Sequence, residues 1–194
     1  MSLRAVQAAS GQRNKSAAQY HFGSRQGLIE AVVAERMGPI NEQRLAMLTA
    51  LDARAEQGEP ATRRELVGVL AEPLAQHALD PTGSTWARFL VQGFADPELS
   101  AVVRHRFEGR SYRDVRARIA ESLDHLPEPL RLTRVDQATG LLVAGLAAAE
   151  VGQGPDLPAE ALVADLVDTA TAVLDAPASP ATLAALDAGE ARSA

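Results

Sequence analysis

The residues whose types and spacing best indicate a binding function lie near the start of the chain, from Asn14 to Leu28. This segment reads Asn-Lys-Ser-Ala-Ala-Gln-Tyr-His-Phe-Gly-Ser-Arg-Gln-Gly-Leu, so polar, basic and aromatic residues alternate with small ones. Such polar and basic side chains bind phosphates and base edges, and alanines let a helix come close to a groove wall. The segment predicts a short DNA-reading helix followed by a tight turn.

A second short helix is expected upstream. Residues 3–10 are mostly small or apolar and end at Gly11, so the two segments together predict a helix-turn-helix. Residues 1–27 contain Arg4, Arg13, Lys15 and Arg25 and no acidic residue, although the whole chain carries a formal net charge of −6. A basic segment on an acidic body is expected to face phosphates. The competing interpretation is a solvated amphipathic arm.

The pattern resembles the DNA-binding module of TetR-type bacterial transcriptional regulators, which ends in a comparable aromatic-Gly-Ser-basic stretch. The resemblance implies that Asn14 caps the recognition helix and that Lys15 and Ser16 meet bases and phosphates at its exposed start. It also implies that His21 and Arg25 bind the phosphate backbone.

The resemblance leaves one contact open. Gln19 stands where the family most often has tyrosine, and Tyr20 follows it. Because neighbouring helical residues point about 100° apart, either Tyr20 takes over the phosphate contact or the contact is lost. The residues expected at double-stranded operator DNA are Arg13, Asn14, Lys15, Ser16, Gln19, Tyr20, His21 and Arg25.

The family's module opens with a further helix, for which the chain starting at Met1 leaves no room. The expectation is therefore a partial helix-turn-helix. By resemblance the chain is a homodimeric regulator, taken as a repressor, whose operator affinity falls when a small-molecule effector binds the helical body. The alternative is a dimeric small-molecule-binding module that does not bind DNA because the first helix is absent.

Composition favours an all-α protein. The 194 residues are rich in Ala, Leu, Glu and Arg and contain only four Phe, two Tyr and one Trp. The absence of cysteine excludes disulfides, thiolate metal sites and a cysteine nucleophile. Neither a signal segment nor an apolar run of ~18 residues is present, which predicts a cytoplasmic protein without a membrane partner. The four histidines are scattered and form no catalytic or metal-binding motif, so we expect no enzyme, metal or cofactor.

The rest of the chain has helical periodicity. Ser24 and Thr62 are expected to cap helices, and Pro39 either kinks one long helix or separates two. A helix from Asp96-Pro97 is expected to run to about residue 125, and two more cover 130–151 and 158–174. The expected domains are 1–37, the partial DNA-binding module and start of the connecting helix; 38–176, the ligand-binding and dimerisation domain; and 177–194, a loose tail.

The body also contains candidate ligand-binding and dimer residues. The resemblance implies a small-molecule pocket in the body, where large aromatic side chains serve either as its lining or as plain core. The candidate pocket residues are Trp86, Phe89, Phe94, Phe107 and Tyr112. The last two expected helices are strongly apolar, and in the family the corresponding helices pair across a two-fold axis. The candidate interface residues are Leu142, Leu146, Leu162, Leu166 and Val173, which could equally complete the monomer core.

Overall fold

The computed structural model describes residues 24–80, 83–152 and 157–193, and within these ranges it contains eight helices and no strand. The predicted all-α class is confirmed. The helices are α3 (Arg25–Ala55), α4 (Arg63–Ala78), α5 (Trp86–Ala95), α6 (Ser100–Phe107), α7 (Arg110–Glu121), α8 (Glu128–Glu150), α9 (Ala159–Asp175) and α10 (Pro180–Ser193).

Helix α3 begins where the sequence predicts. The Ser24 side chain accepts a hydrogen bond from the backbone N–H of Gly27 at 3.0 Å, which satisfies one of the free donors of the first turn. The helix continues for 31 residues with Pro39 inside it, so the structure has one helix here rather than two. The domain boundary expected between residues 37 and 38 falls within this helix.

Helix α4 is the central element of the body. Thr62 and Glu65 form a capping box at its start, as the predicted Thr62 cap requires. Every residue from Leu66 to Leu74 except Glu72 is buried, because α4 packs against α3, α7, α8 and α9. A helix surrounded on so many sides has no broad polar face.

The helix expected from Asp96 to about residue 125 is divided. Helix α6 ends at Phe107 and α7 begins at Arg110, with Gly109 between them. In one straight helix Phe107 and Tyr112 would point about 140° apart. The break instead brings their ring centroids within 5.1 Å of each other in the core. A side chain at Gly109 would also press on Asn41 of α3, with Cβ 3.0 Å from Asn41 Nδ2.

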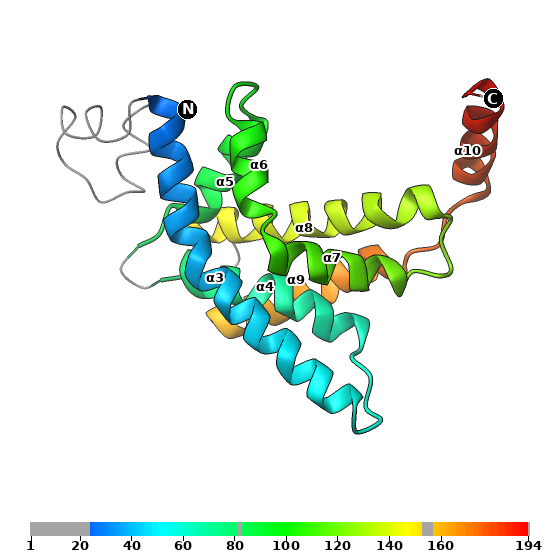
Figure 1. Ribbon diagram of the computed structural model, residues 1–194, viewed down its shortest axis with the longest axis horizontal. Coiled ribbons are helices and arrows are strands. Elements are labelled where there is room, and N and C mark those ends of the chain that lie inside the picture. The colour runs from blue at the N-terminus through cyan, green and yellow to red at the C-terminus, as the bar shows by residue number, and fades with distance from the viewer. Residues whose placement is uncertain (1–23, 81–82, 153–156, 194) are drawn as a thin grey trace.

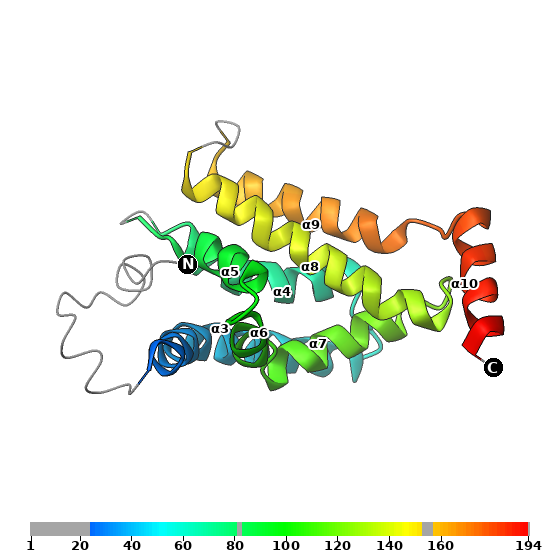
Figure 2. The same cartoon turned by 90° about the horizontal axis from the view of Figure 1, so that it is seen from above.

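Helices α8 and α9 lie side by side and run in opposite directions (Figures 1 and 2). Their close approach depends on Gly145, because a Cβ atom there would collide with the Leu166 side chain. The segment expected to be a loose tail forms α10, which stands at the end of the body opposite the start of α3 (Figures 1 and 2). No helix in the described ranges is long and apolar enough to span a membrane.

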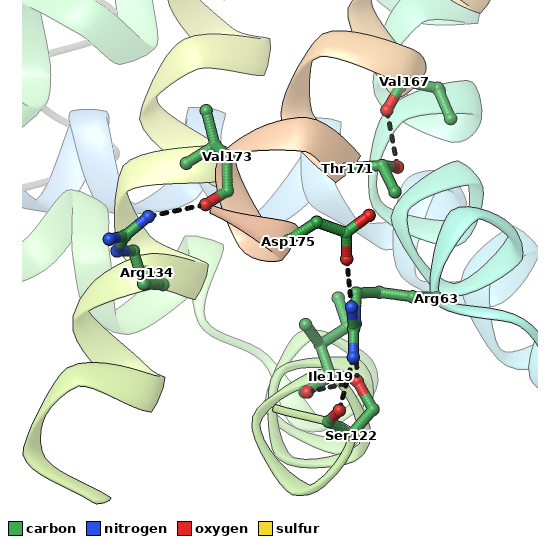
Figure 3. Close-up of polar contacts among 8 residues, drawn as sticks. All are labelled: Arg63, Ile119, Ser122, Arg134, Val167, Thr171, Val173 and Asp175. Atoms are coloured by element: carbon green, nitrogen blue, oxygen red, sulfur yellow. Dashed lines mark hydrogen bonds and ion pairs between the residues drawn. The ribbon is translucent and has the colours of Figure 1, made fainter. Parts of the chain in front are cut away.

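Polar contacts join the neighbouring helices at one end of the body (Figure 3). Arg63 at the start of α4 donates to the hydroxyl and the carbonyl oxygen of Ser122, just after α7, and pairs with Asp175 at the end of α9. Arg134 of α8 donates to the carbonyl oxygen of Val173, also in α9, at 2.8 Å. Helices α4, α7, α8 and α9 are thus tied together by two arginines that both have acceptors.

Candidate functional site

The residues predicted to contact DNA lie almost entirely outside the described ranges. Arg13, Asn14, Lys15, Ser16, Gln19, Tyr20 and His21 precede residue 24, and their placement in space is not described. Arg25 is the first residue of α3, directly after the Ser24 cap. The predicted DNA-binding segment therefore leads without a linker into the first turn of a long helix.

The five predicted pocket residues separate into two groups. Trp86 and Phe89 of α5 stack with centroids 5.3 Å apart and an interplanar angle of 14°. Phe94, Phe107 and Tyr112 form a second group, in which Phe107 touches Phe94 edge-on at 5.2 Å and Tyr112 at 5.1 Å. Phe94 is half-buried and the other four rings are buried. No ring contact between the groups occurs in the described residues.

Two rings of the second aromatic group, Phe107 and Tyr112, lie beside an arginine that sequence reasoning missed. Arg44 of α3 is 1% exposed, and its guanidinium carbon lies 5.6 Å from the centroid of Phe107 and 5.8 Å from that of Tyr112. Nη2 donates to the carbonyl oxygen of Leu70 at 3.3 Å. Nε and Nη1 are buried and find no hydrogen-bond acceptor in the described part of the chain. No described carboxylate forms an ion pair with Arg44.

The aromatic rings compensate this charge only in part. Removing an ion from water costs several kcal/mol, whereas a cation–π contact contributes ~0.5–2 kcal/mol. Burial lowers the pKa of Arg44 to about 10, so the group keeps its proton at neutral pH. Burial also raises the pKa of Tyr112, which keeps the phenol neutral. The site therefore holds a net positive charge inside the protein.

Two further buried polar residues, Ser111 and Thr139, lie close to this arginine in sequence or structure. Ser111, beside Tyr112, donates to Asn41 Oδ1 at 2.9 Å, and Asn41 is one helical turn before Arg44. Thr139 of α8 lies 3.4 Å from the Tyr112 hydroxyl and donates to the carbonyl oxygen of Val135. Ser111 and Thr139 are thus satisfied by neutral groups, and neither supplies a negative charge to the site.

A sequence signal for Arg44 does exist. Met37, Ile40, Leu48 and Leu51 of α3 are buried at spacings of three, eight and three residues, and Arg44 sits midway in the eight-residue gap. The apolar stripe of the helix therefore passes through an arginine. A charged residue at a core position of an otherwise regular stripe could have identified the site.

Another buried charged side chain has a different setting. The Glu150 side chain has no exposed surface. Its two oxygens accept hydrogen bonds from the backbone N–H groups of Ala87 at 2.8 Å and Arg88 at 3.0 Å, in the first turn of α5. The Arg88 Nε atom lies 3.5 Å away. Glu150 therefore caps α5 and meets a favourable helix dipole.

The predicted interface residues also separate. Leu142 and Leu146 of α8 are 2% and 1% exposed, so they belong to the core of the protomer. Leu162, Leu166 and Val173 of α9 are half-buried. The outer face of α8 instead presents Gly140, Ala144 and Ala148. An almost uniformly apolar helix does not indicate which of its sides faces inward, so the sequence left both the interface and the monomer core open for these two leucines.

Three surface grooves are described elsewhere in the body, one of them of about 220 Å³ between α3 and α4. Another, of about 440 Å³, runs between α4 and α9, lined by apolar side chains such as Leu79, Val163 and Val167, with Arg64 and Glu72 among its polar residues. The third, of about 310 Å³, lies between the end of α4 and the α8–α9 connection. Neither Arg44 nor any of the five predicted aromatic residues lines these grooves.

In the described ranges, no cluster of three or more His, Cys, Asp or Glu side chains could hold a metal ion. Comparison with protein-family models, curated proteins and solved structures finds no match to the chain.

Proposed function

We propose that this chain is a DNA-binding transcriptional regulator of the TetR type, with an affinity for operator DNA that a small molecule in the helical body controls. The protein acts as a homodimer and is not an enzyme. Binding of the effector weakens operator binding, so the regulator is a repressor.

The observation that carries this proposal is the basic segment from Asn14 to Arg25 and its direct continuation into α3. The segment combines a cap residue, basic side chains, aromatic residues and a glycine at the spacing that resembles the family. Arg25, the last residue of this segment, is also the first residue of α3, so the segment and the helix are continuous along the chain. DNA recognition by paired heads depends on their spacing, since two helices must enter adjacent major grooves.

The body also offers a physical route from a ligand to α3. Arg106 of α6 pairs with Glu30, one turn into α3, and α6 packs along that helix. The junction between α6 and α7 supplies the Phe107 and Tyr112 rings that cover Arg44. A ligand that prefers one position of this junction would thereby favour one position of α3.

The exposed faces of α8 and α9 support the homodimer. Gly140, Ala144 and Ala148 leave room for a second helix to approach closely, and the half-buried Leu162 and Leu166 lie on the neighbouring α9. Both helices can pair with their symmetry copies in a four-helix arrangement. These exposed small residues replace Leu142 and Leu146 in the proposed interface.

The DNA-binding proposal is tested by selecting duplexes from a random pool with the purified chain and then measuring affinity at several salt concentrations. We expect enrichment of an inverted repeat, as a two-fold dimer requires. Lys15→Ala should weaken binding and lower the salt slope by about 1 if Lys15 meets a phosphate. An unchanged salt slope with an altered sequence preference would indicate that Lys15 contacts a base edge instead.

Arg110→Ala is the matched control, because Arg110 carries the same charge on the body and its side chain is 85% exposed. It should leave the salt slope unchanged. Failure to enrich any duplex, or equal effects of the two variants, would contradict DNA binding by the segment. The alternative of a dimeric small-molecule-binding module would then explain the helical body.

The dimer is tested by Ala144→Arg, which places a long charged side chain on the outer face of α8 without touching the protomer core. Sedimentation should show a monomer. Ala117→Arg, on the exposed face of α7, should remain dimeric. A dimeric Ala144→Arg protein would exclude this face as the interface.

A further inference from the structure

We propose that Arg44 is the anchor of a binding site for a small, flat monocarboxylate inside the helical body. This inference rests on the part of the proposed function that assigns a small molecule to the body, and it does not depend on DNA binding. It names the chemical class of that molecule and the residue that recognises it.

Arg44 carries an unmatched charge. Its side chain is 1% exposed, two of its three nitrogens have no acceptor in the described ranges, and no described carboxylate pairs with it. Buried arginines are ordinarily paired, because an isolated ion in a core is costly. A ligand that brings one negative charge makes the site neutral. A phosphate dianion would leave an excess charge in the same core.

The side chains around Arg44 have the chemistry to bind a flat acid. The Phe107 and Tyr112 rings lie against the guanidinium, so two of the groups nearest to an acid bound at Arg44 are aromatic. Flat apolar groups pack well against such rings, and a guanidinium presents planar donors that match a carboxylate. Together these features favour an aromatic acid over an aliphatic polar one.

Access to Arg44 requires movement of a covering element, because its side chain is 1% exposed and lines none of the described surface grooves. The covering rings stand on either side of the α6–α7 junction at Gly109. That junction is a short, non-helical connection between α6 and α7.

The experiment measures thermal unfolding and calorimetric binding of the full chain with benzoate, benzamide and benzylamine, which share a ring and differ in charge. Ionic strength is kept equal in all samples. Benzoate should bind once per protomer and raise the unfolding midpoint by about 3–6 °C at tenfold its Kd. Benzamide and benzylamine should give much smaller shifts.

Arg44→Met should lose the benzoate response and, without any probe, unfold at the same or a higher temperature, because an unmatched buried charge is replaced by an apolar chain of similar length. Arg44→Lys keeps the charge but not the planar donors, so it should bind benzoate at least tenfold more weakly. Arg116→Met is the control, since Arg116 already pairs with Asp136 at 2.8 Å. This control should keep the full benzoate response.

The inference is overturned if benzoate stabilises the wild type no more than benzamide does, or if Arg44→Met responds to benzoate as the wild type does. It is also overturned if Arg44→Met without a probe loses as much stability as a truncated core residue would. If a neutral or cationic probe binds Arg44→Met as well as the wild type, the carboxylate site is overturned but the proposed effector function is not. If none of the three probes binds, the carboxylate site and the proposed effector function both lose their support.

Discussion

Glu150 and Arg44 are both buried charged side chains, yet their surroundings are opposite. The Glu150 carboxylate has two backbone donors and a nearby arginine, and it caps α5. Arg44 has one long hydrogen bond and two aromatic rings. The fold therefore supplies hydrogen-bond donors to a buried charge that caps a helix. The unsatisfied charge at Arg44 is explained by ligand binding rather than by the stability of the fold.

Loss of the Glu150 carboxylate should have the largest effect on stability. Replacing Glu150 with Ala should lower the free energy of unfolding by about 2–3 kcal/mol, because two backbone donors of α5 lose their acceptor. Urea denaturation measures the change. Glu150→Gln, which keeps one acceptor oxygen, should lose less. The contrast with Arg44 would disappear if Arg44→Met were as destabilising as Glu150→Ala.

Arg63 is a cation that, unlike Arg44, has hydrogen-bond acceptors and an ion-pair partner. Arg63→Ala should lower the free energy of unfolding by about 1–2 kcal/mol, because α4 loses its hydrogen bonds to Ser122 and its ion pair with Asp175 (Figure 3). The neighbouring Arg64 makes one exposed pair with Asp168, so Arg64→Ala should cost less than about 1 kcal/mol. Equal losses in the two variants would show that the buried part of the Arg63 contacts contributes nothing.

The smallest effect is expected for a pair on the surface. The hydrogen bond from Arg54, followed by those from Thr62, lowers the pKa of Glu65 to about 2. A pKa depressed by folding gives stability that is present above the ordinary value near 4.5 and is lost as the pH falls toward 2. Solvent screening keeps this effect small because both side chains are partly exposed.

Denaturation curves between pH 5 and pH 2 should therefore show a slightly weaker pH dependence for Glu65→Gln than for the wild type. A steeper dependence in the variant would mean that folding raises the pKa of Glu65 instead of lowering it. Arg44 and Glu150 are unchanged in this variant, so the measurement isolates the surface pair from the two buried charges.

Local signals in the sequence predicted much of the fold. Ser24 and Thr62 have the side chains that accept first-turn N–H groups, and both cap helices as expected. The last two core helices begin and end within two residues of their predicted bounds. The break at Gly109 was missed because it depends on two rings, Phe107 and Tyr112, meeting in the core, which is a tertiary requirement.

The candidate site was less predictable. The predicted pocket residues lie in two groups, because Phe107 and Tyr112 lie against Arg44 whereas Trp86 and Phe89 stack on each other. Arg44 was overlooked because arginines are normally assigned to the surface, although it interrupts an apolar stripe. Burial of Leu142 rather than Ala144 could not be read from a helix that is apolar on nearly all sides. All of these features depend on which neighbour a side chain meets in the folded protein.

A carboxylate bound at Arg44 is proposed to control DNA binding by the basic segment before α3. The decisive quantity is the affinity for a selected duplex, measured by fluorescence anisotropy with and without saturating benzoate. We expect benzoate to weaken binding by the wild type at least tenfold and to leave Arg44→Met unaffected. Equal wild-type affinity with and without bound benzoate would refute the proposal that a carboxylate at Arg44 controls DNA binding.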